Sequence, residues 1–113
     1  FECADGRFVS LGALEPQFYA ELLRRLGLDD VDPAAQHDSR QWLALRERVA
    51  TRIREKTRDE WTALLEGSDV CFAPVLTLQE APQHRHAQAR AGYLQTADGG
   101  WMPSPAPRFS RSP

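Results

Sequence analysis

The sequence has 113 residues, which is enough for one small domain with a modest hydrophobic core. Its 14 basic and 16 acidic residues give a net charge of −2, so no positive excess is available to attract nucleic acid or an anionic membrane. No apolar run approaches the ~20 residues that a membrane-spanning helix requires. We therefore expect partners other than nucleic acid or membrane.

Two short β-prone runs begin the chain and flank an Asp-Gly pair. Phe1–Cys3 and Arg7–Ala13 are separated by Ala4-Asp5-Gly6, a pattern typical of a β-hairpin. Apolar side chains alternate along the second run from Val9 onward, so one face of this strand should meet the core.

Glu15 lies where this strand is expected to run into a helix. Pro16 suits the first helical position, because the N–H that it lacks would have no intrahelical partner there. Glu15 then takes the capping position, although Ser, Thr, Asp and Asn are the preferred caps. The following proline favours extended backbone at Glu15, and the helix dipole favours an ionised carboxylate. From these features alone, Glu15 is either a tolerated surface charge or a functional carboxylate.

Two longer helices are expected next. Apolar spacing predicts the first over Pro16–Leu26, with Gly27 as its C-terminal cap. An acidic surface loop over residues 28–37 should lead to a second helix, roughly Arg40–Glu55. The three tryptophans are expected to be core anchors; they are Trp42, Trp61 and Trp101.

Two capping boxes mark the starts of further helical segments. Thr57 and Glu60 form the first, opening a short helix that should end near Gly67. Thr77 and Glu80 form the second, opening one more helical turn. A further helix is expected over residues 84–91.

The remaining segments are strands and a proline-rich tail. Val70–Val75 predicts a short buried strand, and Tyr93–Thr96 with Trp101-Met102 predicts a second hairpin around an Asp-Gly turn. Residues 103–113 are rich in proline and should be extended. The fold class is therefore α+β: a small, mainly antiparallel sheet with two hairpins packed against several helices, followed by the extended tail.

The histidines and cysteines form no recognised metal-binding or nucleophile pattern. His84 and His86 are two residues apart, so on a helix they would diverge. Cys3 and Cys71 lie in expected strands and belong to no CxxC spacing. We expect two buried, reduced thiols and no bound metal.

Three stretches together carry a resemblance to a known family. The most specific runs from Ala4 through Gly12-Ala13-Leu14-Glu15-Pro16-Gln17-Phe18 to Tyr19. The others are Asp69-Val70-Cys71-Phe72-Ala73-Pro74-Val75-Leu76 and Pro105-Ala106-Pro107-Arg108-Phe109-Ser110-Arg111. In this order and at this spacing, over nearly its whole length, the chain resembles the family III CoA-transferases, and within them the α-methylacyl-CoA racemases.

The resemblance implies an organisation that is larger than this chain. Family members have a large α/β domain that binds CoA, a small domain joined to it by two linkers, and two interlocked subunits. Residues 1–102 would be the small domain, and residues 103–113 the start of the return linker. The start at Phe1, without methionine, is then expected of a piece of a longer protein. The resemblance further implies a cytoplasmic homodimer that acts in lipid metabolism.

The resemblance also implies an activity and two site residues. In the racemases, a histidine and an aspartate of the large domain move the α-proton of a 2-methylacyl-CoA, in a 1,1-proton transfer that needs no metal or redox cofactor. Coenzyme A is part of the substrate. A glutamate of the small domain pairs with the histidine. Glu15 matches this catalytic position, and Leu14 matches an apolar contact to the acyl chain. The isolated 113-residue chain is expected to be inactive.

Two other functions remain open from the sequence. One is the small domain of a family III acyl-CoA transferase, in which a large-domain aspartate forms a covalent anhydride with the acyl group. The Glu15-Pro16-Gln17-Phe18 stretch favours the racemase, because a transferase has no need of a glutamate there. The other is a stand-alone interaction domain with an exposed apolar face.

Overall fold

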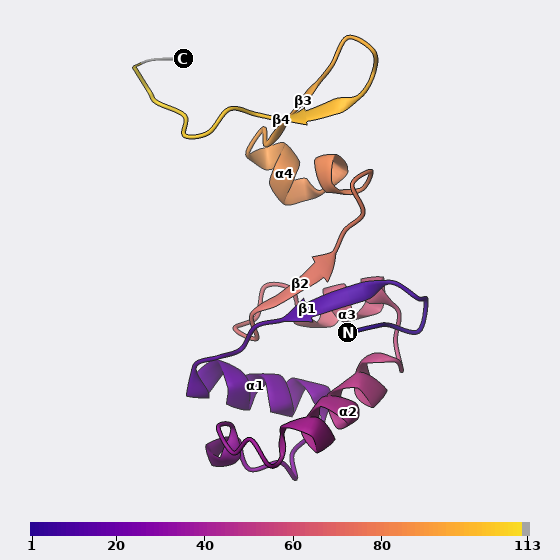
Figure 1. Ribbon diagram of the computed structural model, residues 1–113, viewed down its shortest axis with the longest axis vertical. Coiled ribbons are helices and arrows are strands. Elements are labelled where there is room, and N and C mark those ends of the chain that lie inside the picture. The colour runs from indigo at the N-terminus through magenta and orange to yellow at the C-terminus, as the bar shows by residue number, and fades with distance from the viewer. Residues whose placement is uncertain (112–113) are drawn as a thin grey trace. The chain divides into compact units, whose positions relative to one another are not determined.

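A computed structural model describes residues 1–111, and the chain divides into two compact units, Phe1–Val75 and Leu76–Pro113 (Figure 1). The elements of the first unit are β1 (Phe8–Leu11), α1 (Pro16–Leu26), the 3-10 helix η1 (Pro33–Ala35), α2 (Trp42–Ile53), α3 (Arg58–Leu65) and β2 (Phe72–Val75). Those of the second are η2 (Ala81–Gln83), α4 (Arg85–Ala89), β3 (Tyr93–Gln95) and β4 (Trp101–Pro103). The predicted α+β class is confirmed.

Strand β1 pairs with β2, near the other end of the first unit. The two strands are antiparallel, with Phe8 opposite Val75 and Leu11 opposite Phe72 (Figure 1). The predicted alternation along β1 is confirmed, because Val9 is buried while Phe8 is exposed. The first predicted hairpin is also present: Glu2 bridges Phe8, the Cys3 N–H donates to the Arg7 carbonyl at 2.8 Å, and the Val9 N–H donates to the Phe1 carbonyl at 2.9 Å.

The core of the first unit combines side chains from its strands, helices and connecting segments. Its buried apolar members are Cys3, Val9, Tyr19, Leu22, Leu23, Leu26, Leu28, Val49, Ile53, Trp61, Leu65 and Val70. The indole nitrogen of buried Trp61 donates a 2.7 Å hydrogen bond to the Ile53 carbonyl, so its polar atom is satisfied. This core holds β1 and α1, the two elements that meet at Glu15, in one packed body.

The helix ends follow the predicted capping signals. Helix α1 has the predicted bounds, and Gly27 ends it in the left-handed region at φ 65°. Thr57 and Glu60 form a complete capping box, in which the Glu60 carboxylate accepts from the Thr57 N–H at 2.8 Å. In the second unit, Thr77 and Glu80 exchange the same pair of hydrogen bonds.

The second unit contains the other two-stranded sheet. Strands β3 and β4 form the predicted antiparallel hairpin, with Leu94 opposite Met102. Beyond β4, residues 104–111 form no helix or strand. The Ser104 hydroxyl and the Arg108 guanidinium both donate to the Ala91 carbonyl, at 2.6 and 3.0 Å.

One strand and three residues differ from the sequence predictions. The strand expected to be buried over Val70–Val75 begins at Phe72, and its residues alternate between half-buried and exposed. Cys71, expected in a buried strand, is exposed and has φ 50°, so the left-handed backbone turns it out of the strand alternation just before β2 begins. Trp42 and Trp101, expected in the core, are 55% and 47% exposed. Trp42 is the first residue of α2 and Trp101 the first of β4, where fewer neighbours surround a side chain.

Candidate functional site

The candidate site is the turn that joins β1 to α1. Glu15 precedes the helix with φ −70° and ψ 143°, and Pro16 is the first helical residue, as predicted. The Glu15 side chain is exposed and makes no capping hydrogen bond. Within residues 1–111, its carboxylate has no hydrogen-bond or ion-pair partner. Its oxygens are thus available to a group outside this chain.

Backbone and side-chain donors hold this turn. The Gly12 N–H donates to the Cys71 carbonyl at 3.0 Å, which ties the turn to the residue before β2. The side-chain amide of Gln36 donates to the Leu14 carbonyl at 2.9 Å. The Glu15 carbonyl accepts the first hydrogen bond of α1 from Tyr19 N–H at 2.9 Å. The backbone of the turn is therefore fixed from both sides of Glu15.

A shallow apolar depression lies beside the turn. It has a volume of about 310 Å³ and is lined by Leu11, Gly12, Ala13, Leu14, Tyr19 and Leu22. Leu14, the residue before Glu15, is 69% exposed. The arrangement offers a hydrophobic contact next to a carboxylate.

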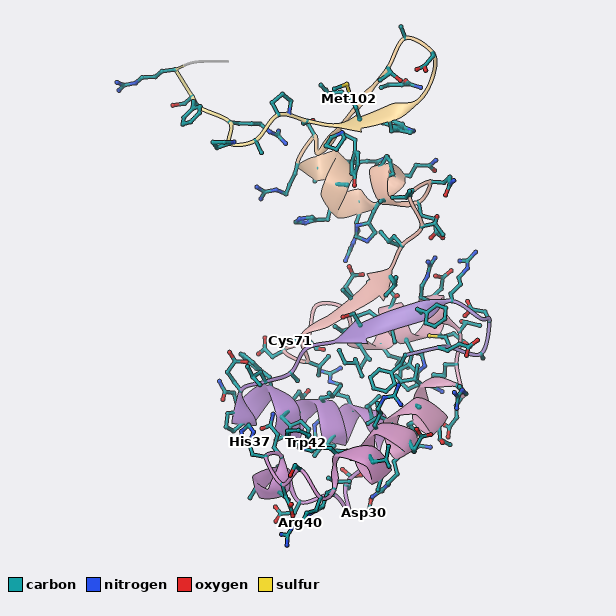
Figure 2. The ribbon with its side chains drawn as sticks, viewed as in Figure 1. Asp30, His37, Arg40, Trp42, Cys71 and Met102 are labelled. Carbon is teal, nitrogen blue, oxygen red and sulfur yellow. The ribbon has the colours of Figure 1, made fainter. Side chains whose placement is uncertain are left out.

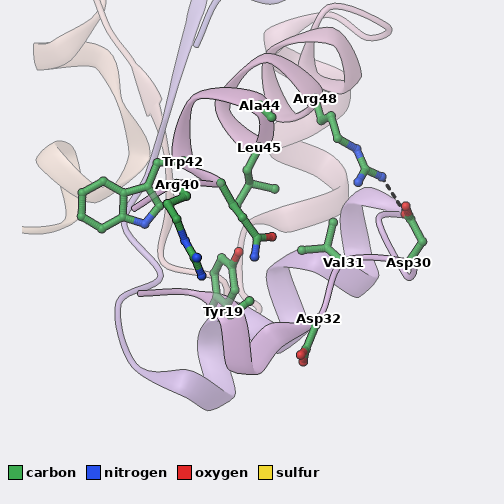
Figure 3. Close-up of a pocket in the computed structure, with 11 residues that line it drawn as sticks. Tyr19, Asp30, Val31, Asp32, Arg40, Trp42, Ala44, Leu45 and Arg48 are labelled. Carbon is green, nitrogen blue, oxygen red and sulfur yellow. Dashed lines mark hydrogen bonds and ion pairs between the residues drawn. The ribbon is translucent and has the colours of Figure 1, made fainter. Parts of the chain in front are cut away.

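A second pocket, of about 370 Å³, lies between α1, the segment around Val31 and the start of α2 (Figure 3). Arg48 and Asp30 form a 2.6 Å ion pair at one side of it, and Trp42 lies at the other side (Figure 3). Its remaining arginine, Arg40, pairs with Asp38 at 2.8 Å.

The charges around this pocket are balanced within the chain. The Arg40 guanidinium lowers the pKa of the Asp38 carboxyl to about 2, and a hydrogen bond from Arg48 lowers the pKa of Asp30. Because each arginine already has a carboxylate partner, the pocket presents no strong positive field to an anionic ligand. The β1–α1 turn, with its unpartnered carboxylate, is the better candidate for chemistry.

Other kinds of site find no support in the described chain. Within residues 1–111, no group of three or more His, Cys, Asp or Glu side chains is placed to hold a metal ion. His37 is exposed and lies in the segment between η1 and α2 (Figure 2). None of the helices described is long and apolar enough to span a membrane.

Sequence reasoning singled out Glu15 and Leu14, whose roles stay predictions, and did not single out Gln36, which contacts the same turn. The structure places Glu15 and Leu14 next to each other at the exposed turn, and Gln36 reaches this turn from a loop more than twenty residues away. Gln36 occupies part of the predicted acidic loop, where a single glutamine carries no recognisable pattern. Gln36 follows directly after η1, and no signal in the sequence indicates that its side chain reaches the turn.

Comparisons with known proteins agree with the sequence resemblance. The family model for CoA-transferase family III matches residues 1–113. The chain is 42% identical to mouse (Mus musculus) alpha-methylacyl-CoA racemase and 34% identical to the human (Homo sapiens) protein of that name, each over 100% of the chain. It is 30% identical to a CaiB/baiF CoA-transferase family protein of Caenorhabditis elegans, over 96% of the chain.

The matching region is only part of each relative. The chain spans about 30% of the length of these three proteins. The crystal structure of a D175A mutant of Rv3272 from Mycobacterium tuberculosis has the same fold, with a TM-score of 0.70 at 18% identity, over 97% of this chain and 32% of that one. The family match over the full chain, together with these relatives, shows that the chain belongs to CoA-transferase family III.

Proposed function

We propose that this chain is the small domain of a 2-methylacyl-CoA racemase, to which it supplies the carboxylate of Glu15. The observation that supports the proposal most is that the Glu15 carboxylate is exposed and has no partner within residues 1–111. Glu15 is exposed on a fixed backbone at a helix start, without a partner in residues 1–111. Since Glu is not a preferred capping residue, the helix start alone does not account for a glutamate at this position. The names of the mouse and human relatives point to the same reaction.

The reaction exchanges one proton on the carbon next to the thioester carbonyl. The thioester acidifies this proton, because the charge left on removing it spreads onto the carbonyl oxygen. One group removes the proton and a second group, on the opposite face, returns one, so the centre inverts. The resemblance to the racemases implies that these two groups are a histidine and an aspartate. Both would belong to a part of the polypeptide outside these 113 residues.

Glu15 would act through that histidine. A carboxylate hydrogen-bonded to an imidazole fixes its tautomer and orientation and stabilises its protonated form. A rigid turn suits this task, because a loosely held carboxylate would lose the geometry that the pair needs. The exposed Leu14 and the depression beside it would contact the acyl chain of the substrate. Neither role calls for a metal or a redox cofactor, and coenzyme A would enter as part of the substrate.

The test is a Glu15→Gln substitution in the complete polypeptide. The amide keeps the size of the side chain and removes its charge, so we expect racemisation of a 2-methylacyl-CoA to slow by about 100-fold or more. The free energy of unfolding should change by less than about 0.5 kcal/mol, since the side chain is exposed. Glu47→Gln, an exposed glutamate of α2, is the matched control and should retain full activity. Near-normal racemisation by Glu15→Gln would remove Glu15 from the mechanism.

A transferase is the second candidate, and the family description with the name of the C. elegans relative favours it. In that case the complete polypeptide would move CoA from an acyl thioester to a free carboxylic acid. The two functions separate in one experiment: incorporation of deuterium at the α-carbon without an acceptor acid supports the racemase, and acceptor-dependent formation of a new thioester supports the transferase.

A further inference from the structure

We propose that Gln36 is a positioning residue for Glu15: its side-chain amide fixes the peptide group from which the Glu15 backbone starts. The inference rests on the role proposed for Glu15 above. It concerns a residue in a different segment of the chain, brought to the turn by the fold rather than by the sequence motif.

The first step of the argument is the geometry around the Glu15 Cα atom. The direction of a side chain is set by the two peptide planes that flank its Cα. The plane before Glu15 contains the Leu14 carbonyl, which accepts from Gln36 Nε2 at 2.9 Å. The plane after it contains the Glu15 carbonyl, which accepts from Tyr19 N–H at 2.9 Å. One hydrogen bond therefore restrains rotation on each side of the Cα atom, and the ring of Pro16 restricts it further.

The second step is that only one of these restraints depends on a side chain. The Tyr19 bond belongs to the helical ladder and is present whenever α1 forms. The Leu14 carbonyl lies before the helix, where the ladder offers it no donor. The same Gln36 Nε2 also lies 3.4 Å from the Ala13 carbonyl, so one amide spans two successive peptide groups of the turn. Gln36 thus supplies the restraint that local structure lacks.

The third step is that Gln36 is itself held in place. The indole Nε1 of Trp42 donates to the Gln36 backbone carbonyl at 2.9 Å. On the other side, the Asp32 carboxylate accepts from Ala34 N–H at 2.9 Å and caps the short helix that leads to Gln36. The half-exposed Trp42 therefore has a use outside the core: it anchors the residue that anchors the turn.

The expected consequence is kinetic. A carboxylate that must meet an imidazole in one geometry loses rate when its backbone can rotate, because misplacement by about 1 Å can cost about 100-fold. We expect Gln36→Met, which keeps the length of the side chain and removes its donor, to lower kcat for racemisation by about 10-fold or more. KM should stay within about 2-fold, because Gln36 is not proposed to touch the acyl-CoA.

The experiment is a double-mutant cycle in the complete polypeptide, made from Gln36→Met, Glu15→Gln and the combined variant. If Gln36 acts through Glu15, Gln36→Met lowers kcat in the native background and has little further effect in the Glu15→Gln background. Gln41→Met is the matched control, since it removes one amide-donated hydrogen bond, to Asp38 at 3.0 Å, in the same segment. It should leave kcat unchanged. Trp42→Phe removes the anchoring donor and should reproduce the Gln36 effect more weakly, which keeps the test usable if Gln36→Met folds poorly.

The outcomes separate this inference from the proposed function. If the complete polypeptide does not racemise, the proposed function fails; if it does and Glu15→Gln racemises normally, the proposed role of Glu15 fails and the inference fails with it. If Glu15→Gln is impaired while Gln36→Met has the native kcat, only the inference is overturned. Equal losses from Gln36→Met with and without Glu15 would also overturn it, because they would show a general structural effect.

Discussion

The two thiols of the first unit differ in exposure, and their reactivity should differ accordingly. Cys3 is buried, and burial, followed by the nearby Asp5 charge, raises the pKa of its thiol. Cys71 is exposed. Because the thiolate is the reactive form, we predict that a thiol reagent labels one cysteine of the folded chain quickly and the second only in denaturant. Cys71→Ser should abolish the fast phase, measured by mass spectrometry; rapid labelling of both thiols in the folded chain would contradict the structure.

Single residues were predictable where their neighbours in sequence decide their conformation. The extended backbone of Glu15 follows from Pro16, and the left-handed Gly27 follows from the end of an apolar repeat. The predictions that Cys71 and Trp42 are buried were wrong, because their exposure depends on packing against residues that are distant in the sequence. The apolar run around Cys71 indicates burial, but a single left-handed residue turns the side chain outward, and no local pattern signals that turn.

Helix α1 ends at Gly27, which adopts a left-handed backbone and leaves space for the Arg52 side chain. Gly27 has φ 65°, and a Cβ placed on it would lie 2.6 Å from Arg52 Nη2. Arg52 Nε donates to the Leu26 carbonyl at 2.6 Å, so Arg52 covers the last turn of the helix. Gly27→Ala should therefore lower the free energy of unfolding by about 1–2 kcal/mol from backbone strain, and by more if Arg52 is displaced. Urea denaturation of the purified chain measures this loss.

Gly67→Ala is the matched control for this prediction. Gly67 also has a left-handed backbone, at φ 80°, but a Cβ there would meet nothing within 4 Å. It should carry the backbone cost alone, and the difference between the two variants isolates the Arg52 contact. Equal losses would show that Arg52 gives way without cost.

The sequence predicted the type and the ends of the helices and strands better than it predicted which strands pair. The capping box of Thr57 and Glu60 and the apolar repeat of α1 are local signals, and both helices begin where those signals indicate. The second partner of β1 was not predictable in the same way. The Asp-Gly turn indicates the pairing with Phe1–Cys3, which the structure contains. The structure also pairs β1 with β2, some sixty residues away, and no local signal indicates that pairing.

At the scale of the whole molecule, composition and hydrophobic periodicity do not by themselves identify the function. Composition and periodicity lead to an α+β domain with one unusual carboxylate, and only the resemblance in sequence motifs suggests a histidine as the partner of this carboxylate. The first unit contains both the β1–α1 turn and Gln36, which contacts it, so this part of the candidate site is formed within Phe1–Val75. The acid and the base of the proposed reaction must come from elsewhere.

The last prediction follows from that division. Proton exchange at an α-carbon needs groups on two faces of the substrate with pKa values near the working pH, and an exposed carboxylate at one turn supplies neither face alone. We expect the purified 113-residue chain to catalyse no exchange of the α-proton of a 2-methylacyl-CoA in deuterated water, as followed by NMR. The complete polypeptide is the positive control. Exchange above the buffer rate by the piece alone would mean that its own residues hold both groups, and would overturn the proposed division of the active site.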